Sequence, residues 1–150
     1  MADRQTPENE GIGSVSYWAG ALRRLFARRT STPKDGAYWE KQAAAFLRSK
    51  GYRIISRNVR MRRGELDIVA LRGDMTVFVE VKQRNTDEFG GGSYAIDFQK
   101  RHRLLSAAKE FLSREGLTQR PCRFDTIIID TGKERPSFTH TENAFEDDSR

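Results

Sequence analysis

Two apolar runs joined by a very short polar link constrain the fold of this chain more than any other feature. The runs 66–71 and 76–81 are separated by Arg72-Gly73-Asp74-Met75, and Gly-Asp favours the two-residue turn of a β-hairpin. Because successive side chains of a strand point to opposite faces, both faces of this hairpin would carry apolar residues. Each face then needs a covering layer, which predicts a layered α/β domain.

Elements that could supply this cover flank the hairpin in the sequence. Asp35 can cap a helix over about 36–50 that ends at Gly51, and a short strand follows at 52–58. Leucine, alanine and phenylalanine recur at helical spacing over about 98–114. The run 124–129 is dense in β-branched residues and reads as another central strand. The order predicts an αβββαβ core: a mixed central sheet of about four or five strands, flanked by helices.

Composition divides the 150 residues into one domain and two expected tails. Residues 1–35 are expected to be a flexible basic extension, in which 17–29 form a short basic amphipathic pattern. Residues 36–132 hold the folded domain. Residues 133–150 carry three basic and five acidic groups and are expected to be a flexible acidic tail.

The net charge of +6 and a pI near 9.8 favour a polyanionic partner such as nucleic acid or an anionic membrane surface. No apolar run reaches the length of a membrane-spanning helix, and no secretory leader is recognisable. The expectation is therefore a cytoplasmic protein without stable membrane association. One cysteine and two histidines exclude a zinc cluster, so a bound metal would need oxygen ligands.

The hairpin register brings acidic residues together. If Arg72 pairs with Met75, then Asp67 lies opposite Glu80, and Glu65 lies opposite Lys82. Facing carboxylates repel, so a positive charge is expected between them.

Two sources of that charge are open. One is the Lys82 ammonium, within a surface salt-bridge network. The other is Mg²⁺, which prefers oxygen ligands and could be held by Asp67, Glu80 and the backbone carbonyl of Val81. Such an ion could polarise a phosphodiester and activate a water, which is the chemistry of a metal-dependent nuclease. Glu65 could pair with Lys82 or act as a third metal ligand.

These residues resemble a known family. Glu40 on the first helix, Gly64-Glu65-Leu66-Asp67, Phe78-Val79-Glu80-Val81-Lys82-Gln83-Arg84, Lys100 and Arg123-Phe124-Asp125 look like the YraN-like family of uncharacterised bacterial proteins. That family is assigned to the restriction-endonuclease-like superfamily, with the signature PD-(D/E)XK, which includes archaeal Holliday junction resolvases. The resemblance spans about residues 36–130. Leu66 stands where the signature has proline, a position that is often relaxed.

The resemblance implies roles for four residues. Asp67 and Glu80 would bind Mg²⁺, with Mn²⁺ as a substitute, and Lys82 would be the catalytic lysine. Glu40 would complete the site, although without the resemblance it is better interpreted as a solvated residue at the edge of its helix or as an early-helix acid favoured by the helix dipole. The second helix, including Lys100, would approach the phosphate backbone.

Eight basic residues are candidates for phosphate contacts, since they lie in the segment that also holds the acids. An ordinary solvated face is the alternative. They are Arg57, Arg60, Arg62, Arg63, Arg84, Lys100, Arg101 and Arg103.

Three functions follow from these observations. The first is a Mg²⁺-dependent nuclease that cleaves DNA, favoured over RNA, with branched or structured DNA among its substrates. The second is a nucleic-acid-binding protein that keeps the nuclease fold without turnover. The third is a peripheral membrane protein that binds through residues 17–29. A homodimer stays open, because cutting both strands of a duplex favours two-fold assembly.

Overall fold

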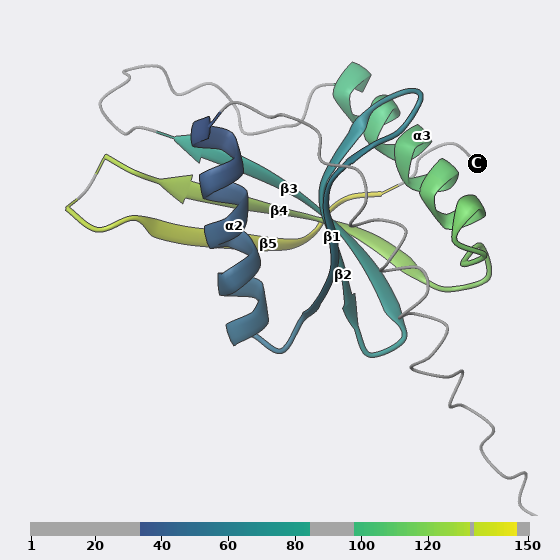
Figure 1. The fold of residues 1–150 in the computed structure, drawn as a ribbon, viewed down its shortest axis with the longest axis horizontal. Helices are drawn as coiled ribbons and strands as arrows, with labels where there is room; N and C mark the ends of the chain where they lie inside the picture. The colour runs from purple at the N-terminus through teal and green to yellow at the C-terminus, as the bar shows by residue number, and fades with distance from the viewer. Residues whose placement is uncertain (1–33, 85–97, 133, 147–150) are drawn as a thin grey trace, which may run out of the picture.

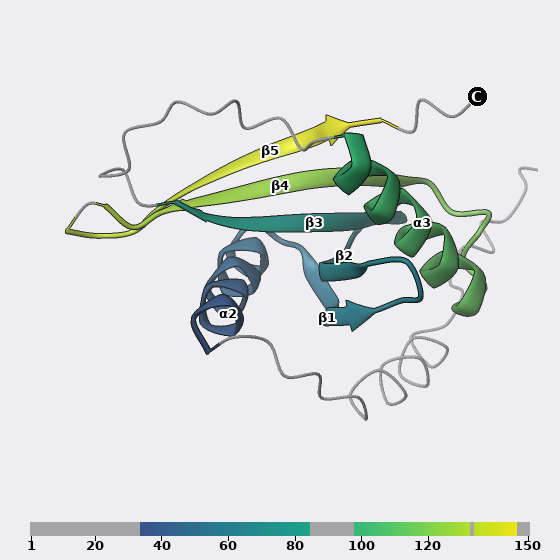
Figure 2. The same ribbon diagram turned by 90° about the horizontal axis from the view of Figure 1, so that it is seen from above.

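The computed structural model describes residues 34–84, 98–132 and 134–146. Five strands form one sheet in the order β1-β2-β3-β4-β5, in which β3 and β4 are parallel and the other neighbours are antiparallel. Helices α2 and α3 lie on opposite sides of this sheet (Figures 1 and 2). The elements are α2 (Lys34–Ser49), β1 (Arg53–Arg60), β2 (Glu65–Arg72), β3 (Met75–Arg84), α3 (Phe98–Arg114), β4 (Cys122–Asp130) and β5 (Ser137–Phe145).

The fold confirms the predicted mixed α/β class. A helix, three strands, a helix and a parallel strand follow in the expected order, and the five-stranded sheet is consistent with a restriction-endonuclease-like fold. The crossover from β3 through α3 to β4 makes these two strands parallel. The second helix has the expected bounds, whereas the first begins at Lys34, two residues before the expected start.

The central hairpin has the predicted register. Arg72 pairs with Met75, and the pairing continues to Ile68 opposite Val79. Gly73 adopts a φ of 61° in the turn, a conformation that costs glycine little. The ladder between β2 and β3 ends at Ile68 and Val79, so Asp67 and Glu80 lie just beyond its last pair.

Each face of the sheet packs on one helix. Ala43 and Leu47 of α2 cover one face, and Leu104 and Phe111 of α3 cover the other. On the α3 side, the rings of Phe78, Phe124 and Phe145 stack across β3, β4 and β5, with centroids 5.4 and 4.8 Å apart. Both faces of the hairpin are therefore buried, as its two-sided apolar pattern predicts.

The expected acidic tail at 133–150 is wrong for most of its length. Residues 137–145 form β5 along the edge of β4, although their sequence is mostly polar. Two aromatic residues anchor the strand: Phe138 stacks on Phe46 with centroids 5.1 Å apart, and Phe145 is buried in the α3 side of the core. The apolar anchors are so far apart in the sequence that the segment lacks the alternation by which a strand is recognised.

The flexible extension expected over 1–35, with its amphipathic pattern, lies outside the described residues except for 34 and 35, which belong to α2. In the described part of the chain, no helix is long and apolar enough to cross a membrane.

Candidate active site

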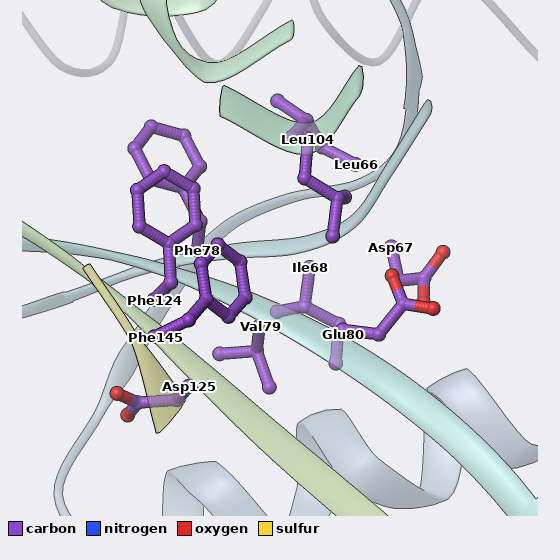
Figure 3. A pocket seen from close by; sticks show the side chains of 10 residues that line it. All are labelled: Leu66, Asp67, Ile68, Phe78, Val79, Glu80, Leu104, Phe124, Asp125 and Phe145. Carbon is purple, nitrogen blue, oxygen red and sulfur yellow. The ribbon is translucent and has the colours of Figure 1, made fainter. Parts of the chain in front are cut away.

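Asp67 and Glu80 face each other where β2 and β3 separate. Figure 3 shows their carboxylates pointing toward one another at one end of a small cavity. The Val81 N–H donates to Asp67 Oδ2 over 2.8 Å, in the place where a backbone partner would continue the ladder. The strand end thus fixes the Asp67 carboxylate beside that of Glu80. The cavity is lined by Leu66, Asp67, Ile68, Phe78, Val79, Glu80, Leu104, Phe124, Asp125 and Phe145.

This arrangement makes ionisation of Asp67 costly. Burial, followed by the negative charge of Glu80, raises the pKa of Asp67 to about 8. The Val81 N–H and the Lys100 ammonium lower this pKa, and the negative charge of Glu40 adds to the increase. An acid so strongly perturbed by a second acid at the rim of a cavity is typical of a functional site.

The ammonium in contact with Glu80 comes from Lys100 on α3. Glu80 is only 7% exposed, so the carboxylate end of this ion pair is buried, whereas the lysine end is partly exposed. Lys82 lies two residues beyond Glu80 on β3 and is half-buried. Within the described residues, Lys82 makes no ion pair with a carboxylate, so Lys100 supplies the cation that the sequence suggested for Lys82.

Glu40 is buried on α2 near this pair. Burial raises its pKa, with further increases from Glu65 and Glu80, while a hydrogen bond from the Asn58 side chain and the charge of Arg57 lower it. Its Oε2 atom is buried and accepts no hydrogen bond from the described residues. Glu40 therefore belongs to the electrostatic environment of the acid pair, although a metal set of three such side chains is absent from the described residues.

Glu65 has a different partner from the one expected. Its Oε2 lies 3.7 Å from the Arg60 Nε across the β1–β2 pairing, and its other oxygen is buried without a hydrogen bond from the described residues. The expected pairing of Glu65 with Lys82 does not form, because the β2–β3 ladder ends before it reaches them.

The turn between β1 and β2 packs against α3, as Figure 1 shows. The Arg62 N–H donates to Glu110 Oε2 over 3.0 Å, and a Cβ on Gly64 would lie 3.0 Å from the backbone oxygen of Arg103. Only glycine permits so close an approach without displacing the helix. The sequence does not disclose this role of Gly64. Glycine is required there because of a contact with Arg103, which lies 39 residues further along the chain.

This packing joins two groups of the basic candidates. The turn that carries Arg62 and Arg63 lies beside Arg103 of α3, whereas Arg57 of β1 acts on Glu40 of α2, and Arg84 lies at the end of β3. Arg101 is half-buried, with its guanidinium 5.8 Å from the Phe145 ring centroid. The exposed members are Arg57, Arg60, Arg62, Arg63, Arg84 and Arg103.

Comparisons with known proteins point to one family. The family model described as "Uncharacterised protein family UPF0102" matches residues 39–129. A UPF0102 protein of Pseudomonas aeruginosa (strain LESB58) is 42% identical over 121 residues, covering 79% of this chain and 97% of its own. A UPF0102 protein of Symbiobacterium thermophilum is 43% identical over 111 residues, 73% of this chain and 94% of its own. One from Hahella chejuensis is 38% identical over 120 residues, with 80% and 96% covered.

Proposed function

This chain belongs to the UPF0102 family of the restriction-endonuclease-like superfamily, and we propose that it is a Mg²⁺-dependent nuclease that hydrolyses phosphodiester bonds in DNA, including branched or structured DNA. The observation that carries this proposal is the acid pair. Asp67 and Glu80 are fixed face to face with only partial compensation of their charge, an arrangement that a divalent cation would complete.

The donor chemistry suits a hard cation such as Mg²⁺. Asp67 and Glu80 would hold it together with the Val81 carbonyl. The N–H and C=O of one residue in an extended strand point to the same side, and the Val81 N–H points to Asp67. The absence of a third His, Cys, Asp or Glu ligand from the described residues is no obstacle, because Mg²⁺ takes one or two carboxylates and keeps several waters. Mn²⁺ is expected to substitute.

The residues of the chain would divide the reaction between them. When bound, the ion would polarise the phosphodiester and lower the pKa of a water. Lys82, on the same strand as Glu80, would offset the charge that develops on the scissile phosphate. Glu40 would accept a hydrogen bond at its otherwise unused Oε2, which would orient the attacking water.

The basic residues would position the substrate. Exposed arginines of the turn after β1 and of α3 lie close together because the turn packs on the helix, and the exposed arginines of β1 lie on the strand that leads into this turn. They could contact phosphates without reading bases. This arrangement supports a substrate recognised by its backbone and shape more than by its sequence.

The test is cleavage of labelled duplex, single-stranded and four-way-junction DNA and of RNA, with Mg²⁺, Mn²⁺ or EDTA. We expect cutting with either metal and none with EDTA. Glu80→Gln and Lys82→Ala should lower the rate by about 100-fold or more. Lys109→Ala, which removes an exposed lysine of α3, should leave it unchanged. Cleavage that persists in EDTA or in both site variants would refute the mechanism.

A nucleic-acid-binding protein without turnover is the second candidate. The Lys100–Glu80 ion pair favours it, because an internal cation already compensates one of the acids. Under this alternative no substrate is cut, while binding retains a steep dependence on salt concentration. The same panel of nucleic acids, titrated at several salt concentrations, separates the two functions.

A further inference from the structure

Lys100 turns toward the acid pair, whereas the sequence placed it among residues that contact phosphates. It is the third residue of α3, and its ammonium contacts the buried Glu80 Oε1. The same charge acts on Asp67, where it favours the ionised form. Lys100 therefore compensates Glu80 directly and Asp67 only in part, at the position that the proposed function gives to a metal ion.

An ammonium and a divalent cation cannot both occupy this position. They would compete for the same carboxylate oxygens, and at such a separation their charges repel strongly where the surroundings are partly desolvated. The Lys100 side chain is 39% exposed, and its flexible four-carbon stem can carry the ammonium toward solvent without movement of the helix.

We propose that Lys100 is the exchangeable counter-ion of the Asp67–Glu80 pair: its ammonium leaves Glu80 when a divalent cation binds, and then faces the phosphate backbone of the substrate. This inference rests on the proposed function and adds a regulated step to it. The acid pair keeps a cation in both states, so it is never left uncompensated, and phosphate contact by Lys100 depends on metal binding.

The two lysines of the site then have separate tasks. Lys82 is borne on β3, two residues from Glu80, so its backbone is held by the sheet. Lys100 is borne on α3, and its ammonium contacts the Glu80 carboxylate. Only Lys100 has to move between the two states of the site.

The first experiment measures the accessibility of each lysine by brief reductive methylation and mass spectrometry, with and without saturating Mg²⁺. The Lys100 ammonium is expected to react at least threefold faster when metal is bound. The exposed Lys41 and Lys109 serve as internal references and should not change. Asp67→Asn, which removes a metal ligand, should abolish the difference at Lys100.

The second experiment measures Mn²⁺ affinity by electron paramagnetic resonance. Lys100→Met removes the competing charge but keeps much of the apolar stem, so we expect Mn²⁺ to bind about tenfold more tightly. Lys109→Met, the matched change on the same helix, should bind Mn²⁺ like the unmodified protein.

The outcomes separate this inference from the proposed function. If the unmodified protein binds Mn²⁺ but Lys100 labelling does not rise, or Lys100→Met binds Mn²⁺ no more tightly, the exchange is refuted while the metal site stands. If the unmodified protein binds no Mn²⁺, the metal-dependent function fails and the exchange fails with it.

Discussion

Asp67 and Asp125 are aspartates of the same sheet whose pKa values move in opposite directions. Burial acts on both carboxyls in the same sense, raising the pKa. The pKa of Asp67 rises to about 8, whereas that of Asp125 falls below its ordinary value. Figure 3 shows the Asp125 carboxylate pointing away from the acid pair. The difference therefore lies in the partners that the fold gives to each acid.

Asp125 is fully buried, and both of its carboxylate oxygens have hydrogen-bond partners. His140 Nε2 lies 2.8 Å from one carboxylate oxygen, Arg123 binds both oxygens at 2.9 and 3.2 Å, and the Asn143 N–H donates over 3.0 Å. Asn143 has a φ of 51° in an irregular part of β5, so this bond supports a backbone that the β4–β5 ladder does not. Asp125 serves the attachment of β5.

Among the described residues, Asp67 has instead one hydrogen-bond donor, the Val81 N–H, and a carboxylate neighbour whose effect exceeds that of the Lys100 ammonium. A group with these surroundings weakens the fold when it ionises, and such a cost persists at sites where function requires it. Burial alone therefore does not distinguish Asp67 from Asp125. The imbalance between burial and charge compensation does, and such an imbalance is typical of functional sites.

The largest expected loss of stability is for a substitution of Asp125. Asp125→Asn should lower the free energy of unfolding by about 3 kcal/mol, because it removes the buried carboxylate that Arg123 and His140 both contact. Urea unfolding at pH 7 measures the loss. Asp74→Asn, the same change at an exposed residue of the hairpin turn, should stay within about 0.5 kcal/mol. Equal losses in both variants would contradict a special role for Asp125.

The same substitution at Asp67 should instead raise the free energy of unfolding. A pKa raised from 3.8 to about 8 means that the folded state retains a proton that the unfolded chain has lost. Without metal, stability should therefore fall as the pH rises through this window. Asp67→Asn should remove the fall and raise the free energy of unfolding at pH 8 by on the order of 2 kcal/mol.

Urea unfolding at pH 5 and pH 8 in EDTA tests this window, and repetition with Mg²⁺ adds a second contrast. Mg²⁺ should stabilise the unmodified protein at pH 8 but not Asp67→Asn, since a ligand stabilises only the state that binds it. A stability that rises from pH 5 to pH 8 in EDTA, in a manner that depends on Asp67, would show that the pair is not under-compensated.

A substitution of Gly64 is expected to lower stability less, and it affects only the turn that leads into β2, the strand of Asp67. Gly64→Ala would place a Cβ 3.0 Å from the Arg103 backbone oxygen, so the turn must shift from α3 at a cost of about 1 kcal/mol or more. Gly36→Ala is the matched control, because nothing lies within 4 Å of its added Cβ. The expected result is reduced stability and cleavage for Gly64→Ala only. Equal behaviour of the two variants would show that the turn does not need this close packing.

The sequence predicts the parts of the fold that depend on local patterns and misses those that depend on tertiary contacts. The hairpin register and the bounds of α3 follow from local signals: a Gly-Asp turn, apolar alternation and helical spacing. The facing of Asp67 and Glu80 is a consequence of that register. By contrast, β5 is held by separated aromatic anchors and by the Asp125 bonds, and Lys100 reaches Glu80 only through the β3–α3–β4 crossover. These contacts depend on the tertiary fold, so local sequence patterns do not predict them.

The smallest loss of stability is expected for Glu142, the exposed member of the cluster formed by Asp125, Arg123, His140 and Glu142. Its substitution tests whether the buried Asp125 or the exposed Glu142 contributes more to stability. Glu142 also contacts Arg123, at 3.2 Å, and accepts the Tyr52 O–H over 2.8 Å, but its side chain is 53% exposed, whereas that of Asp125 is 0% exposed. Water can replace what Glu142 provides, and a glutamine can still accept from Tyr52. Glu142→Gln should therefore lower the free energy of unfolding by less than about 1 kcal/mol. In urea unfolding beside Asp125→Asn, a loss as large as that at Asp125 would assign the stability of the cluster to its exposed ion pair. A small loss would leave the buried carboxylate as its stabilising centre, the role that Asp67 lacks.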